Sequence, residues 1–193
     1  MFLQLTQFFQ TVQGYSPLGS GLRILPWTLA PMFIAPFAGA MSDRISPRRI
    51  IGTGLAMQAV ALAWIAAVST PTTPYAALVA PFILAGVGMA LFFSPMANVV
   101  LSSVRSEQEG QASGANNAIR EMGGVFGVAV MVSVFSRYGG YGTGQSFVDG
   151  MTPALWIGAV AVGLGVIAAF AIPTVRREHT TEAEAFAPLA EAA

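Results

Sequence analysis

The sequence contains no cysteine and no lysine, and it carries few charged residues of either sign. Without cysteine the chain can form no disulfide, thiolate nucleophile or thiolate metal site. Without lysine it cannot hydrolyse ATP through a P-loop, whose lysine binds the phosphates. Charged residues make up 9% of the chain, whereas soluble domains have roughly 25%. Because 54% of the residues are hydrophobic as well, the composition excludes an ordinary soluble domain.

The few charges are separated by long apolar stretches. Charge is absent from residues 1–22, 24–42, 50–104 and 150–175. About 20 apolar residues cross the ~30 Å core of a bilayer as a helix, in which every backbone polar group is paired within its own segment. We therefore predict an all-α integral membrane protein, with the lipid bilayer as its solvent.

Five complete spans are expected, at about 22–41, 50–68, 75–104, 111–136 and 152–175. They form a bundle over residues 14–175, because pairs of Gly and Ala four residues apart let helices approach closely. Residues 1–13 rise only about 20 Å as a helix, so they are either the second half of a span or an amphipathic interfacial helix. Residues 176–193 are a polar tail.

Arginines fall in alternate connections between the expected spans. One side of the bundle receives Arg44, Arg48, Arg49, Arg105, Arg176 and Arg177, and the other receives Arg23 and Arg137. By the positive-inside rule the first side is cytoplasmic. The chain is therefore expected to be a multi-pass protein of a bacterial plasma (inner) membrane, with its C-terminus in the cytoplasm.

The connection between the first two spans, residues 39–49, reads GAMSDRISPRR. Ser46 followed by Pro47 has the form of a helix N-cap and first-turn proline. Asp43 would then lie near the positive end of the following helix, where a carboxylate is favourable. The loop is either a latch between this charge and the helix or a connection that only fixes topology.

The fourth span carries polar residues in an otherwise apolar helix. Only 15 uncharged residues separate Glu121 from Arg137, a rise of about 22 Å and less than the thickness of the bilayer core. Arg120 and Glu121 therefore either snorkel to the cytoplasmic face or lie within the membrane, where ionisable groups mark a pathway or a packed pair. The candidates for a substrate cavity are Asn98, Asn116, Asn117, Arg120 and Glu121.

Three stretches of the chain resemble segments of a known family. GAMSDRISPRR resembles the short cytoplasmic motif of the major facilitator superfamily, although Ser46 stands where that family usually has glycine. The stretch ASGANNAIREMGGVFGVAV, residues 112–130, is similar to the penultimate span of the fourteen-span drug:proton antiporter branch. Residues 14–32 resemble the tenth span of the same branch. The chain thus looks like half of the ninth span followed by the tenth to fourteenth.

The resemblance implies the C-terminal part of an efflux permease. Such a permease exports small hydrophobic or amphipathic drugs, in exchange for protons, by alternating access between two halves. The N-terminal half would be the missing partner, so this chain alone is not expected to transport. In the family the short motif is thought to latch one conformation, and the corresponding switch residues would be Gly39, Asp43, Arg44, Pro47, Arg48 and Arg49.

A second hypothesis is a small membrane protein that does not transport. It would act as a partner or assembly subunit through its Gly and Ala helix faces. The sequence contains no nucleophile–base set and no metal cluster that would indicate an enzyme. No cofactor, metal ion or nucleic acid is expected as a partner.

Overall fold

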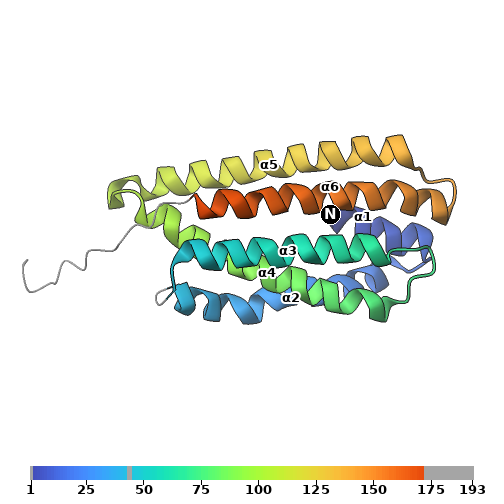
Figure 1. Cartoon of the computed structure of the whole chain (residues 1–193), viewed down its shortest axis with the longest axis horizontal. Coiled ribbons are helices and arrows are strands. Elements are labelled where there is room, and N and C mark those ends of the chain that lie inside the picture. Colours follow the sequence, from blue (N-terminus) through green and yellow to red (C-terminus); the bar gives the residue numbers. More distant parts are fainter. Residues whose placement is uncertain (1, 43–44, 172–193) are drawn as a thin grey trace, which may run out of the picture.

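Figure 1 shows a computed structural model of the chain, which describes residues 2–42 and 45–171. Every regular element in this part of the chain is a helix. The elements are α1 (Phe2–Gln7), the π-helix η1 (Phe8–Val12), α2 (Pro17–Ser42), α3 (Pro47–Val68), α4 (Tyr75–Ser102), the 3₁₀ helix η2 (Ser106–Gln108), α5 (Glu109–Tyr138) and α6 (Gly144–Phe170). Five of these helices are long and apolar enough to cross a membrane, which confirms the predicted fold class.

The long helices run side by side, so their connections lie at two ends of the bundle (Figure 1). The arginine-rich end carries the connections α2–α3 and α4–α5, with Arg48, Arg49 and Arg105. The aromatic end carries α1, η1 and the connections 69–74 and 139–143. Asp43, Arg44, Arg176 and Arg177, which the sequence placed at the first end, lie outside the described residues.

Helix α6 begins at Gly144, earlier than the start near residue 152 expected from the sequence. Thr143 is its N-cap, and the side chain of Thr143 accepts a hydrogen bond from the backbone N–H of Ser146. Asp149 interrupts the uncharged run, but its carboxylate is exposed and accepts a hydrogen bond from Gln145 one turn earlier, at 2.8 Å. A charge that ends an uncharged run therefore does not end the helix.

The main core lies toward the aromatic end. Most of its buried residues come from η1, from the last turns of α3 and from the first parts of α4 and α6, and α1, α2 and α5 add Leu5, Ile24, Trp27 and Phe135. Aromatic rings meet there, with Phe9 and Phe82 edge-on at 6.3 Å between ring centroids. Helix α5 takes little part in this core, because its buried residue is Phe135, near the aromatic end.

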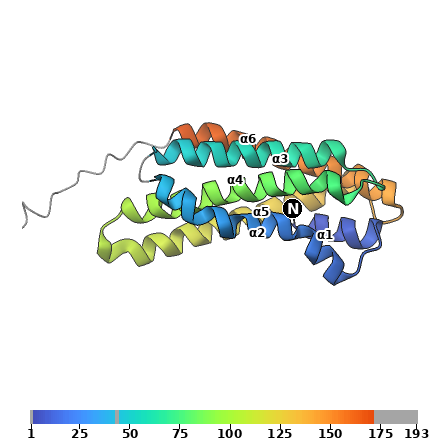
Figure 2. The ribbon, with the colours of Figure 1, turned by 90° about the horizontal axis from the view of Figure 1, so that it is seen from below.

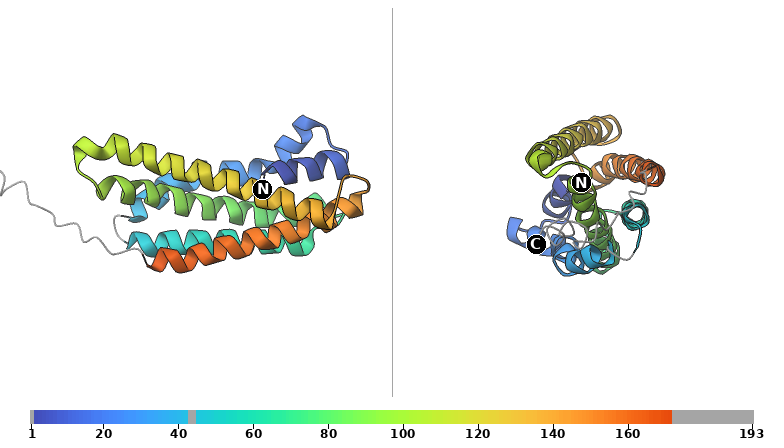
Figure 3. Two further views of the ribbon diagram at one scale, coloured as in Figure 1. Left: turned by 90° about the horizontal axis from the view of Figure 1, so that it is seen from above. Right: turned by 90° about the vertical axis from the view of Figure 1, so that its left-hand side faces the viewer.

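Helix α4 is at the middle of the bundle. It lies between α2 and α3, as the view in Figure 2 shows, and it packs closely against both. Helix α5 packs mainly beside α6 and only lightly against α4 (Figure 3). This arrangement leaves α2 and α5 on either side of one face of α4.

Candidate functional site

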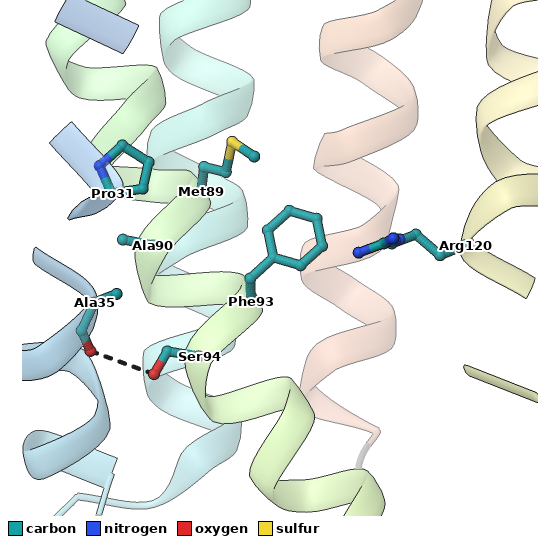
Figure 4. A pocket seen from close by; sticks show the side chains of 7 residues that line it. All are labelled: Pro31, Ala35, Met89, Ala90, Phe93, Ser94 and Arg120. Carbon is teal, nitrogen blue, oxygen red and sulfur yellow. Dashed lines mark hydrogen bonds between the residues drawn. The ribbon is translucent and has the colours of Figure 1, made fainter. Parts of the chain in front are cut away.

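A pocket of about 400 Å³ lies on the face of α4 between α2 and α5. Figure 4 shows the residues that line it, with Arg120 extending from α5 toward the ring of Phe93. The lining residues are Pro31, Ala35, Met89, Ala90, Phe93, Ser94 and Arg120. The walls are therefore mainly apolar, with one hydroxyl and one guanidinium.

The lining residues share helix faces because of their spacing. On α4, Met89 and Phe93 are four residues apart, and so are Ala90 and Ser94. Residues four apart lie above one another on a helix. The Ser94 hydroxyl donates to the backbone carbonyl of Ala35 on α2, at 3.3 Å. This hydrogen bond joins the two helices beside the pocket.

Pro31 helps to bring α2 and α4 together. Proline has no N–H, so it cannot donate to the carbonyl four residues earlier, which is that of Trp27. Gly86 of α4 lies against that carbonyl oxygen, and a Cβ built on Gly86 would collide with it and lie 2.8 Å from the Ala30 Cβ. Close approach of the two backbones at Gly86 thus positions the next turns of α4, which carry the pocket.

Arg120 makes two hydrogen bonds within its own helix. Its Nη2 donates to Asn117 Oδ1 at 2.7 Å and to Glu121 Oε1 at 3.2 Å. The guanidinium carbon lies 5.9 Å from the centroid of the Phe93 ring. Phe93 precedes the end of α4 at Ser102 by a rise of about 14 Å, so Arg120 lies alongside α4 rather than beyond its end.

The structure divides the polar residues that the sequence proposed for the cavity. Arg120 lines the pocket, and Asn117 and Glu121 are its hydrogen-bond partners. Asn98 is exposed one turn beyond Ser94, and Asn116 is half-buried on α5. Neither of these two asparagines lines the pocket.

The proposed switch loop is described in part. Pro47 is the first residue of α3 and Ser46 is its N-cap, but the Ser46 side chain makes no capping hydrogen bond. Arg48 is half-buried and Arg49 is exposed at the start of the same helix. Gly39 packs against the wall of the pocket, since a Cβ built on it would lie 3.4 Å from Ser94 Oγ.

Sequence reasoning did not identify the apolar walls of the pocket or a second arginine site. The guanidinium of Arg23 stacks on the ring of Tyr15, 3.4 Å from its centroid, and lies 5.6 Å from that of Tyr75. The four-residue spacing of Met89 and Phe93 indicated that they share a helix face, although it does not show which helix that face meets.

Among the described residues no cluster of His, Asp and Glu could hold a metal ion.

Known proteins with similar sequences include several transporters. The chain is 35% identical over 138 residues to multidrug resistance protein Stp of Mycobacterium tuberculosis (strain ATCC 25618 / H37Rv). The matched region covers 72% of this chain and 25% of Stp. It is 29% identical over 167 residues to multidrug efflux pump LfrA of Mycolicibacterium smegmatis, covering 86% of this chain and 32% of LfrA. It is 27% identical over 133 residues to multidrug export protein EmrB of Escherichia coli (strain K12), covering 69% and 26%.

The chain thus spans about a third or less of the length of these relatives. Residues 1–192 match the Major Facilitator Superfamily. The match covers nearly the whole chain, agrees with its five apolar helices and confirms the resemblance seen in its motifs. The chain belongs to the Major Facilitator Superfamily.

Proposed function

We propose that this chain is the C-terminal part of an efflux permease that exports small hydrophobic or amphipathic compounds by alternating access. The position of the pocket carries the proposal. The pocket lies between α2 and α5. In the most apolar 18-residue stretch of each helix, 17% of the residues are buried in α2 and 11% in α5, against 22% in α6, 39% in α4 and 44% in α3. A pocket on an uncovered face is what half of a two-part transporter presents to the other half.

The other half would close the pocket into a central cavity. Transporters of this family are built from two repeats with the substrate site between them. The relatives are about three or more times as long as the matched region, so they have the length for a second half. We propose that the exposed sides of α2 and α5 contact this half, and that neither part transports alone.

Orientation and coupling complete the proposal. One end of the bundle carries Arg48, Arg49 and Arg105. By the positive-inside rule this end lies on the cytoplasmic side of a bacterial plasma membrane. The C-terminus would then be cytoplasmic, because α6 ends at the same end (Figure 1). Export would be driven by proton influx, with the coupling acids in the other half. Gly39, against Ser94, would relay movement of the 39–49 loop to the pocket.

The test is efflux from cells in which the gene encoding this chain is deleted or altered. Deletion should raise the accumulation of a neutral fluorescent dye such as Nile red, and a protonophore should raise it equally in the wild type. A tagged Met89→Trp variant, which fills the apolar pocket, should fail to restore efflux at a normal membrane level, whereas Val60→Phe, at an exposed position of α3 outside the pocket, should restore it. Unchanged accumulation after deletion would refute the proposed function.

A further inference from the structure

The charge that the pocket presents comes from Arg120. Among the described residues that line it, Arg120 is the only ionisable one. Ser94 is the other side chain with a polar group, and its hydroxyl already donates to the carbonyl of Ala35. The donors available to a ligand are therefore those of the guanidinium.

Arg120 keeps most of its hydrogen-bonding capacity. A guanidinium has five N–H donors, and both hydrogen bonds that Arg120 makes to described residues use Nη2. The Nε–H and the two Nη1–H groups remain. Glu121 partly balances the charge, but it is exposed and does not line the pocket. The described residues that line the pocket thus include no acid that could pair with a cationic compound.

The rest of the pocket suits the apolar part of an amphipathic molecule. Met89 and Phe93 on α4 and Pro31 and Ala35 on α2 form the apolar part of its lining. Methionine adapts to ligands of different shape. The Arg120 guanidinium lies toward the Phe93 ring, so a ring bound against Phe93 would bring its substituent near the free N–H groups. An ionic interaction between a charged substituent and the guanidinium is stronger where water is excluded.

We propose that this pocket selects amphipathic compounds that carry an anionic group, a carboxylate or a sulfonate, which binds the guanidinium of Arg120. The inference rests on the proposed function, since it names the substrate class of the same pocket. Arginine pairs with such groups through two parallel hydrogen bonds. A cationic compound of the same size would be repelled by Arg120, and a neutral one would gain only from the apolar walls.

The test is binding to the purified full chain in nanodiscs of zwitterionic phosphatidylcholine, with empty nanodiscs as background. Three ligands share one fluorophore and differ in charge: dansylglycine is anionic, dansylamide is neutral and dansylcadaverine is cationic. Dansylglycine should bind most tightly. Arg120→Gln should weaken it by about tenfold or more and change dansylamide by less than about twofold. Arg120→Lys should fall between the two, because lysine keeps the charge but loses the fork of donors.

Two further variants make the result specific. Arg137→Gln removes a charge from the same helix outside the pocket and should leave all three affinities unchanged. Met89→Trp should fill the pocket and weaken all three ligands, while circular dichroism and the unfolding midpoint report whether each variant is folded.

Equal affinity for the three ligands, no binding, preference for the cation, or the same loss in Arg137→Gln would overturn the proposal. If binding shows no charge preference but deletion of the gene still abolishes efflux, the proposed selection for anions is wrong and the proposed efflux function stands. The proposed function fails if deletion leaves efflux unchanged.

Discussion

Gly54 of α3 and Gly88 of α4 are in reciprocal backbone contact. A Cβ built on Gly54 would lie 2.7 Å from the carbonyl oxygen of Gly88, and one built on Gly88 would lie 2.6 Å from that of Gly54. Small residues at such crossings let membrane helices pack backbone to backbone. Gly86, two residues earlier, makes the equivalent contact with α2. These two glycines on different sides of α4 hold it between its neighbours.

Gly88→Ala should therefore destabilise the purified chain by about 1–3 kcal/mol, because the added methyl group meets backbone atoms that cannot rotate away. The free energy of unfolding in mixed micelles measures this. Gly127→Ala on α5 is the matched control, since nothing lies within 4 Å of its Cβ position. The control should leave stability unchanged or raise it by up to about 1 kcal/mol through helix propensity. Equal effects of the two substitutions would contradict the contact.

A second prediction concerns Arg23 at the aromatic end. Its guanidinium stacks 3.4 Å from the centroid of the Tyr15 ring, and cation–π pairs with limited access to water contribute about 1–2 kcal/mol. A double-mutant cycle with Tyr15→Leu and Arg23→Met should give a coupling free energy of this size. The control is the exposed pair Arg137 and Tyr138, in which the guanidinium carbon lies 6.0 Å from the ring centroid. Its coupling free energy should be no more than about 0.5 kcal/mol.

Coupling as small for Arg23 as for the control would show that the stacking does not stabilise the fold. Loss of the Arg23 stack should also increase amide hydrogen exchange in η1. The backbone N–H of Tyr15 donates to the carbonyl of Phe9 in this helix at 3.0 Å, and the side chain of Gln13 donates to the carbonyl of Thr73 at 2.9 Å.

The sequence predicted the spans because uncharged length is itself the physical requirement for crossing a bilayer. The same criterion missed the first turns of α6, where Asp149 is tolerated at an exposed position in hydrogen-bond contact with Gln145. The N-cap at Thr143 was the local signal that charge counting overlooked.

The site was predicted less completely than the fold. The polar residues of α5 could be singled out, because Arg120 is unusual in an apolar helix. The other residues that line the pocket could not, since bringing Phe93 and Met89 into the same pocket as Pro31 depends on where α2 and α4 cross. That crossing is set by Gly86 against the Trp27 carbonyl, a contact between residues far apart in the sequence that leaves no periodic signal.

The crossing of α2 and α4 can be tested with cysteines, because the natural chain has none. Ala35→Cys with Ser94→Cys should cross-link under copper phenanthroline, as Ser94 Oγ lies 3.3 Å from the Ala35 carbonyl oxygen. Adding Gly86→Ala should reduce the yield severalfold by separating the helices. Ala35→Cys with Trp64→Cys, on α3 nearer the aromatic end, should not cross-link. A yield that is insensitive to Gly86→Ala would show that this glycine does not set the crossing.

The exposed side of α5 supports a prediction that separates stability from function. Gly123 and Gly127 have nothing within 4 Å of their Cβ positions, so Gly127→Leu should leave the unfolding free energy of the purified chain within about 0.5 kcal/mol of the wild type. If the chain is half of a transporter, as proposed, the same leucine would prevent close packing of the other half, and efflux should be lost at a normal membrane level. Val60→Phe, at an exposed position of α3 away from the pocket, should preserve both stability and efflux. If Gly127→Leu preserves efflux as well, the other half does not dock closely at this turn of α5, and the cavity must be closed along α2 instead.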